Sequence, residues 1–374
     1  MTSEHAPACP PRREAGRMVI PVGPQHPLLK EPMSIEMELS GEQVAGVTVN
    51  IGYVHRGLEE LFQRRTYMQN LIVVECICGI CSHAHTTAYC QAVESLLDVK
   101  LPPRAAYLRV LMCELERIHS HLLWLGVLAE AIGFTTIFMY AWRDREMILD
   151  IMEQLSGGRI AHNANIIGGV RMDVSADEAP AVMERLREFH GQLDLFRQLV
   201  ERDRSFHRRT EYIGVMDPEM VRAFSIVGPA ARASGDGLDM RRDAPYLIYD
   251  QLDFEVITAS DGDVWSRALV RLEETVQSVR LCEQILAKLP EGPLSIRVPA
   301  RVPAGETVAR IEAPRGELLY YVRSDDSDHP QRVKVRTPTL PTLMALERML
   351  PGLHTADIAA VIAGADLCVA CADR

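Results

Sequence analysis

The sequence predicts a mainly helical α+β fold, in which a bundle of long helices is joined to small β-rich regions. Three observations support this prediction. A segment near the N-terminus alternates apolar and polar residues, several later segments place apolar residues every three or four positions, and residues 291–340 mix proline, glycine and β-branched residues. Alternation is typical of half-buried strands, whereas steps of three and four indicate helices with one apolar face.

The first β-rich region is predicted from a hairpin pattern. Residues Met33–Leu39 alternate, Ser40–Glu42 have turn composition, and Val44–Ile51 alternate more loosely as the returning strand. We expect a flexible, polar, proline-rich N-terminus over residues 1–17 and one large domain over the remainder. Its expected parts are a β lobe (18–52), a helical bundle (53–290), a small β or loop region (291–340), and a C-terminal helix with a ligand motif (341–374).

The helices are predicted from their apolar stripes and their ends. The first begins at Pro102-Pro103 and carries leucines from Leu108 to Leu125, and the second covers about 139–155 and ends at Gly157. Two more stripes run over 182–200 and 269–286, and a shorter helix follows Pro341. We expect residues 228–235 to form a loop and the apolar run 71–74 to be strand-like. Narrow stripes on several long helices favour a bundle with a packed core.

One apolar run, Leu122–Trp142, is long enough to span a bilayer. It contains Glu130 and Gly133, and charged segments flank it on both sides. We therefore interpret it as buried core helix broken near Gly133. The first residues also lack the apolar stretch of a signal peptide.

Composition limits the classes of function. The chain has 374 residues, of which 47% are hydrophobic and 24% charged, so disorder is excluded. Its net charge of −11 argues against a nucleic-acid partner. Nine cysteines, four of them in paired CxxC units, fit a reduced, metal-binding protein better than a disulfide framework.

The two CxxC units carry the strongest functional signal. Cys78 and Cys81 form the first, and Cys368 and Cys371 form the second, close to the end of the sequence. Two thiolates at this spacing can point at one metal, but local zinc ribbons place their two pairs about 15–20 residues apart. A site assembled from both ends of the chain suits catalysis better than a local structural staple. From the residues alone, a catalytic metal, a structural zinc and unrelated cysteines all remain open.

The surrounding residues resemble a known family. ECICGICSHAH at 75–85 and DLCVACADR at 366–374 are similar to the two cysteine motifs of [NiFe] hydrogenase large subunits. Six more segments resemble the membrane-bound, energy-converting (group 4) hydrogenases and the related 49-kDa subunit of respiratory complex I. They are PVGPQHP at 21–27, YVHRGLE at 53–59, ELERIHSH at 114–121, GPAARASG at 228–235, RRDAPY at 241–246 and EAPRGEL at 312–318.

The resemblance implies the large-subunit fold and a nickel–iron centre that carries CO and cyanide on its iron. It implies Cys78 and Cys368 as terminal nickel ligands, with Cys81 and Cys371 bridging nickel and iron. Soft thiolates suit both metals. Hydrogen would be split heterolytically, and Cys368 would be the first acceptor of the proton.

Four further catalytic residues follow from the same resemblance. Arg315 would place a permanent charge over the open metal position, and Asp366 would hold that guanidinium by a bidentate pair. His85 would donate a hydrogen bond to a bridging sulfur, and Glu31 would relay protons from the nickel thiolate. His119 and His121, by contrast, are expected to pack or hydrogen-bond rather than bind metal.

Several positions depart from the family pattern. Cys76 stands where relatives usually have arginine, Leu367 where they usually have proline, and Ala131 about where complex I relatives often have aspartate. The absence of that aspartate argues against quinone chemistry. Many hydrogenases are cut after the basic residue that matches Arg374, so the resemblance implies a processed form or a gene without the extension.

The function implied is the catalytic large subunit of an energy-converting [NiFe] hydrogenase, interconverting protons and H2 and coupled to ion translocation. Its iron–sulfur clusters are expected on partner subunits only, because no remaining cysteines have ferredoxin spacing. Expected partners are an iron–sulfur small subunit like that of complex I, ferredoxin-like or other donor subunits, and membrane ion-translocating subunits. The chain would lie peripherally on the cytoplasmic side of the cell membrane. Two alternatives are a nickel-free, complex-I-like subunit reducing quinone or sulfur compounds, and a scaffold with structural zinc.

Overall fold

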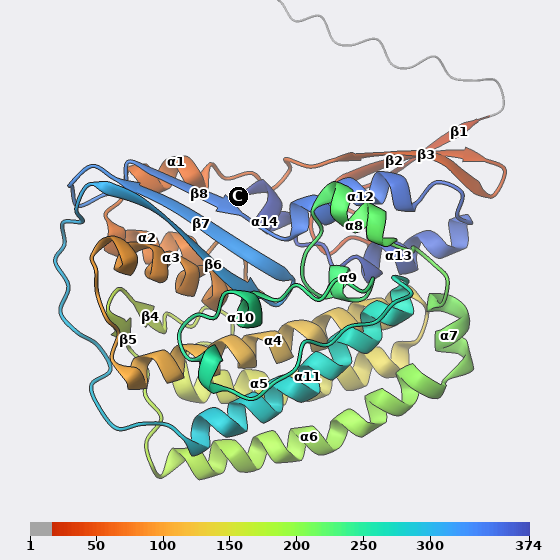
Figure 1. Ribbon diagram of the computed structural model, residues 1–374. Helices are drawn as coiled ribbons and strands as arrows, with labels where there is room; N and C mark the ends of the chain where they lie inside the picture. The colour runs from red at the N-terminus through yellow and green to blue at the C-terminus, as the bar shows by residue number, and fades with distance from the viewer. Residues whose placement is uncertain (1–16) are drawn as a thin grey trace, which may run out of the picture.

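The computed structural model describes residues 17–374, so the predicted flexible N-terminus lies outside the described residues except for Arg17. The long helices run side by side beneath the sheets β1–β3 and β6–β8, and the last helix, α14 (Val369–Asp373), lies between these sheets in this view (Figure 1). This mainly helical α+β arrangement confirms the predicted fold class.

The N-terminal sheet consists of β1 (Met18–Val22), β2 (Ser34–Ser40) and β3 (Gln43–Asn50), all antiparallel. Along β2, Ile35, Met37 and Leu39 point into the core while the residues between them face outward, as the alternation predicted. The chain turns at residues 41–42 and returns as β3. Both predicted strands and the turn are confirmed.

The bundle is formed by α4 (Pro103–Ala131), α5 (Thr135–Ser156), α6 (Glu178–Arg202) and α11 (Val264–Ala287). Helix α4 packs against α5 and α11, and α11 also packs against α6. The break between α4 and α5 contains Gly133 at a φ of 79°, which confirms the predicted interruption. Within residues 17–374, no helix is both long and apolar enough to cross a membrane.

Between β3 and α4, three shorter helices lead the chain through the first cysteine motif. They are α1 (Leu58–Gln63), α2 (Tyr67–Glu75) and α3 (Ser82–Leu96). The strand-like interpretation of residues 71–74 was wrong, because they belong to α2. A capping box starts this helix: Thr66 accepts a hydrogen bond from Gln69 N–H, and the Gln69 side chain accepts one from Thr66 N–H. Within the run, Leu71 and Val74 face the core, three positions apart on the helix, whereas Ile72 is exposed.

The remaining elements connect the bundle to the second sheet. They are β4 (Asn165–Ile166), β5 (Gly169–Val170), α7 (Arg204–Thr210), α8 (Pro218–Phe224), α9 (Pro229–Arg232), α10 (Met240–Asp243) and the 3-10 helix η1 (Tyr249–Gln251). Residues 228–235, predicted as a loop, contain the one-turn helix α9, which begins with proline at its first position.

The second sheet, β6 (Gly305–Ala313), β7 (Gly316–Ser324) and β8 (Arg332–Arg336), is antiparallel and confirms the small sheet predicted within 291–340. The chain then forms α12 (Thr339–Met349), the 3-10 helix η2 (Thr355–Asp357), α13 (Ile358–Gly364) and α14. Helix α13 packs on α4 and α11, which brings the C-terminal motif back to the centre of the fold.

Candidate metal centre

The four motif cysteines meet in the interior. Cys78 and Cys81 lie in the loop between α2 and α3, whereas Cys368 and Cys371 lie at the start of α14. The Sγ atoms of Cys78 and Cys368 are 3.3 Å apart, those of Cys81 and Cys371 are 3.6 Å apart, and those of Cys368 and Cys371 are 3.2 Å apart. All four side chains are buried. The structure therefore assembles one site from the two ends of the sequence, as the paired motifs predicted.

The donor set fits a metal group. All four cysteines are free thiols, with sulfurs well beyond the ~2.05 Å of a disulfide. Hydrogen bonds from the other three thiols hold the pKa of Cys78 well below its usual range, and the hydrogen bond to Cys368 helps raise the pKa of Cys371 well above its own. Four buried sulfurs cannot all be ionised without a cation among them. Soft, mutually contacting sulfurs suit nickel, iron or zinc.

The turn before Cys368 is held by a cluster of cations. Asp366 has a φ of 52° and its carboxylate accepts from Lys30 at 3.1 Å, Arg271 at 3.3 Å and Arg315 at 3.0 Å. Burial alone would raise the pKa of Asp366, but the three cations hold it well below its usual range. Asp366 is thus a buried anion that fixes this turn and orients three positive groups.

Arg315 lies in the turn between β6 and β7, close enough to interact electrostatically with Cys78, Cys81 and Cys368. Its Nη2 reaches the Asp366 carboxylate, but its Nε donates to the Asp366 backbone oxygen at 3.1 Å. Arg315 therefore makes two hydrogen bonds to Asp366, but only one of them is to the carboxylate. The expected bidentate pair with both carboxylate oxygens is not formed. The other terminal nitrogen of Arg315, Nη1, is buried and has no hydrogen-bond partner among the described residues. Such an orphaned donor fits a small polar ligand supplied by a bound group.

His85 connects a cysteine to the second sheet. Its Nε2 lies 3.5 Å from Cys371 Sγ, and its Nδ1 lies 2.7 Å from the Tyr320 hydroxyl on β7. Burial lowers the pKa of His85 to about 4, so the ring is neutral near pH 7. A neutral ring has one N–H, and the Tyr320 hydroxyl can donate to Nδ1 and leave Nε2–H for the sulfur.

Glu31 lies on the segment before β2. Its Oε1 is 3.8 Å from Cys368 Sγ, while its Oε2 accepts from Ala370 N–H at 2.9 Å. Burial raises the pKa of Glu31, which the hydrogen bond from Ala370 partly offsets. A carboxyl group with a raised pKa beside a thiol can take a proton and pass it on.

Sequence reasoning overlooked three residues of this neighbourhood: Lys30 and Arg271 on Asp366, and Tyr320 on His85. Lys30 could have been found as the neighbour of Glu31, but no sequence signal singles out Arg271 or Tyr320. His119 and His121 both form hydrogen bonds, as predicted. His119 Nε2 lies 3.1 Å from the Ile80 carbonyl oxygen, and His121 Nε2 lies 2.9 Å from Glu274.

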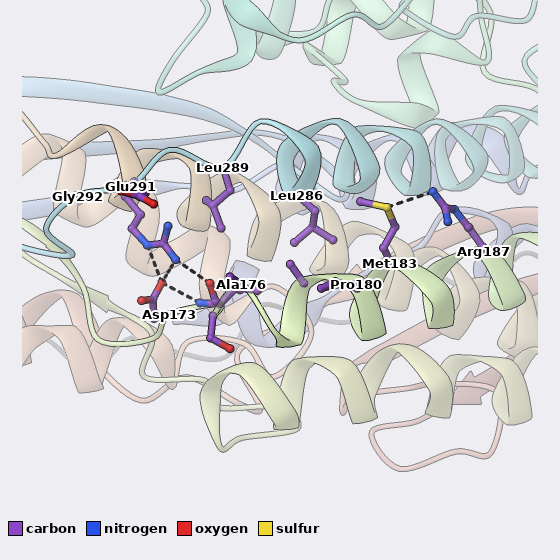
Figure 2. A pocket seen from close by; sticks show the side chains of 13 residues that line it. Asp173, Ala176, Pro180, Met183, Arg187, Leu286, Leu289, Glu291 and Gly292 are labelled. Atoms are coloured by element: carbon purple, nitrogen blue, oxygen red, sulfur yellow. Dashed lines mark hydrogen bonds and ion pairs between the residues drawn. The ribbon is translucent and has the colours of Figure 1, made fainter.

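A separate groove lies away from the cysteine centre. It encloses about 680 Å³ between the N-terminal part of α6 and the C-terminal end of α11 (Figure 2). Met183, Leu286 and Leu289 line it, as does Arg104, which donates to Asp173 and to the Val174 carbonyl. None of its lining residues belongs to the cysteine centre.

Comparison with known proteins places the chain in a family. The family described as "Respiratory-chain NADH dehydrogenase, 49 Kd subunit" matches residues 131–301 and 295–374, and "Nickel-dependent hydrogenase" matches residues 56–156. The chain is 40% identical to a carbon monoxide-induced hydrogenase of Rhodospirillum rubrum, covering 95% of this chain and 99% of the relative. It is 38% identical to a subunit of the F(420)H(2) dehydrogenase of Methanosarcina mazei, covering 96% and 99%.

Other relatives belong to respiratory complexes. A subunit of the NADH-quinone oxidoreductase of Rhizobium meliloti is 37% identical, with 96% of this chain and 95% of the relative covered. Among solved structures, a chain of the membrane-bound sulfane sulfur reductase, an archaeal respiratory membrane complex, superposes with a TM-score of 0.92 at 32% identity, covering 96% and 99%. With its fold, motifs and relatives in agreement, the chain belongs to the oxidoreductase family that unites the 49-kDa subunits of complex I with the large subunits of nickel-dependent hydrogenases.

Proposed function

We propose that this chain is the catalytic large subunit of a membrane-associated, energy-converting [NiFe] hydrogenase, which interconverts protons and H2 in a complex that also translocates ions. The observation that carries the proposal is the meeting of four buried, unpaired cysteine sulfurs from both ends of the sequence. Four thiols brought into contact from both ends of the chain favour a shared metal site over separate structural cysteines. The hydrogenase among its relatives supports the same assignment.

In this proposal the cysteines bind the metals and a neighbouring carboxyl group exchanges protons. Cys78, Cys81, Cys368 and Cys371 would together hold a nickel–iron centre with CO and cyanide, with Cys78 and Cys368 as ligands of the nickel. When bound, this group supplies the redox chemistry of hydrogen. Glu31 would exchange a proton with the Cys368 sulfur, from which it lies 3.8 Å away.

Three side chains would support the centre without exchanging protons. The Arg315 guanidinium keeps its charge at any working pH and has a free donor, Nη1, in the buried site. Asp366 fixes its orientation, and His85 donates a hydrogen bond to Cys371.

Electrons would come from a partner. Outside the centre, the described residues contain only the scattered cysteines Cys76, Cys90, Cys113 and Cys282, so we place the iron–sulfur clusters on an adjacent small subunit like that of complex I. Exposed apolar side chains lie close to the first motif. Ile72 is one turn before the exposed Cys76, and Ile160 packs against Gly79.

The rest of the complex would comprise ferredoxin-like or other donor subunits and membrane ion-translocating subunits. The chain itself would sit peripherally, on the cytoplasmic side of the cell membrane. H2 and protons would be its substrates.

A second candidate is a subunit that reduces sulfur compounds or quinone without nickel. The similarity to the sulfane sulfur reductase favours it, as do Cys76 and Leu367, where hydrogenase relatives usually have arginine and proline. A third is a scaffold in which the four cysteines bind zinc.

Metal analysis of the purified, matured complex distinguishes these candidates. We expect nickel and iron in equal amounts at the site, in addition to the iron of the partner clusters. Iron from clusters alone, with turnover of polysulfide or quinone but not H2, would favour the second candidate. One zinc per chain without nickel would favour the scaffold.

A further inference from the structure

The loop that carries Cys78 and Cys81 is attached to the middle of helix α4. Two side chains one turn apart on that helix, Glu116 and His119, reach the backbone of the loop and of the first turn of α3. Both side chains are buried. Neither belongs to a cysteine motif, and neither has a role in the chemistry proposed above.

Glu116 caps the N-terminus of α3. Its Oε1 accepts from His83 N–H at 2.6 Å and its Oε2 accepts from Ala84 N–H at 2.9 Å. Cys81 is the residue before this helix, and its side chain makes no capping hydrogen bond. The first turn of a helix needs acceptors for its free N–H groups. Burial raises the pKa of Glu116 to about 8, and the hydrogen bonds from His83 and Ala84 N–H, one to each carboxyl oxygen, oppose that rise. Glu116 supplies from α4 the cap that α3 lacks in its own sequence.

His119 forms a hydrogen bond with the residue that precedes Cys81. Arg145 on α5 donates from Nε to His119 Nδ1 at 3.2 Å, so Nδ1 is the acceptor nitrogen of the ring. The proton of the neutral ring is therefore on Nε2, which donates to the Ile80 carbonyl at 3.1 Å. Burial lowers the pKa of His119 to about 3, which keeps this tautomer uncharged.

We propose that Glu116 and His119 are positioning residues. Through their hydrogen bonds to the backbone at residues 80 and 83–84, they set where the Cys81 sulfur lies relative to Cys371. The inference rests on the proposed function for its metal readout, but the attachment itself is a property of the chain alone. A displaced Cys81 sulfur would change the electron density of a metal group held there without removing a ligand.

The test compares isosteric variants in the matured complex and in the metal-free chain. Glu116→Gln keeps the size of the side chain but presents an amide NH2 to one of the two backbone donors, leaving that donor unpaired. Glu114→Gln is the matched control. Glu114 is also a buried α4 carboxylate, two residues away, but it accepts from Tyr249 and Ser278 at 2.6 Å and does not touch the loop.

In the matured complex, we expect the infrared bands of metal-bound CO and cyanide to shift in Glu116→Gln and to stay in place in Glu114→Gln. In the metal-free chain, amide hydrogen exchange at residues 82–85 should become roughly tenfold faster in Glu116→Gln only. Unshifted bands in Glu116→Gln, or equal shifts in both variants, would overturn the inference. Absence of these bands from wild type would instead count against the proposed function, while the exchange experiment would still test the attachment.

His119 provides an independent test if Glu116→Gln does not fold. His119→Leu removes the donor to Ile80 and should shift the bands, whereas His119→Gln, whose Nε2 can still donate, should restore them toward wild type. Identical band positions in His119→Leu and wild type would refute the role of His119.

Discussion

The Oε1 atom of Glu31 lies 3.8 Å from the Sγ atom of Cys368, although 337 positions separate the two residues in the sequence. The contact exists because the segment before β2 runs against the start of α14, where Ala370 N–H donates to the other Glu31 oxygen. This hydrogen bond fixes the carboxyl group beside the sulfur. A proton therefore needs to cross only one contact between sulfur and carboxyl group.

Replacing Glu31 by glutamine should remove the proton acceptor and leave the centre intact. We expect the exchange of D2 with solvent protons to fall by roughly 10²–10⁴-fold, the contribution typical of a positioned acid or base. Nickel content should not change. Glu36→Gln, at an exposed position of β2, is the control. Wild-type exchange in Glu31→Gln would assign the relay to another group.

Replacing Cys368 by serine should abolish hydrogen turnover while the chain stays folded, since the change is nearly isosteric but exchanges a soft ligand for a hard one. Hydrogen evolution and the thermal unfolding midpoint are the measurements. Cys90→Ser is matched in burial but lies outside the centre, so its activity should stay near that of wild type. Full turnover by Cys368→Ser would refute its assignment as a ligand.

Replacing Arg315 by lysine should lower the rate by roughly 10²-fold or more with the metals retained. Lysine keeps the charge but presents all its donors from one nitrogen. It therefore does not reproduce the planar fork in which Nε and Nη2 reach the Asp366 backbone oxygen and carboxylate while Nη1 stays available to the site. The rate per nickel measures the effect, and Arg301→Lys, in an exposed ion pair, serves for comparison. A wild-type rate per nickel would show that Arg315 has only a structural role.

The buried histidines make the fold sensitive to acid. The pKa of His119 falls from about 6.5 when unfolded to about 3 when folded, so between these values the unfolded chain binds one more proton. Stability from this group is thus complete above pH 6.5 and is lost as pH falls toward 3.

Glutamine does not titrate, so His119→Gln removes this difference in bound protons between the folded and the unfolded chain. Between pH 5 and 6.5, the free energy of unfolding of the metal-free chain should depend on pH less steeply than in wild type, by up to ~1.4 kcal/mol per pH unit. Urea unfolding at several pH values checks this. Parallel pH profiles for the two proteins would mean that His119 is protonated equally in both states.

The sequence predicted what depends on local pattern. The strands β2 and β3, the stripes of α4, α6 and α11 and the break at Gly133 all follow from spacing and turn residues. Residues 71–74 were misassigned because a four-residue apolar run fits either a strand or a buried helical turn. The Thr66–Gln69 capping box was the signal that could have decided it.

The partners of the site residues were less predictable than the site itself. The paired CxxC units predicted that four sulfurs would meet, but nothing local indicates that Lys30 and Arg271 share Asp366 with Arg315. These contacts join the N-terminal segment, α11 and the turn after β6, so they depend on how distant elements pack. The same holds for Glu116, whose partners lie on a different helix.

The measurement that tests the central claim most directly is an infrared spectrum of the matured complex. A nickel–iron centre held by Cys78, Cys81, Cys368 and Cys371 predicts bands of metal-bound CO and cyanide that disappear in Cys371→Ser and persist in Cys90→Ser. Protein that is matured and active toward another acceptor, but has no such bands, would contradict the hydrogenase assignment and leave the nickel-free reductase as the better account.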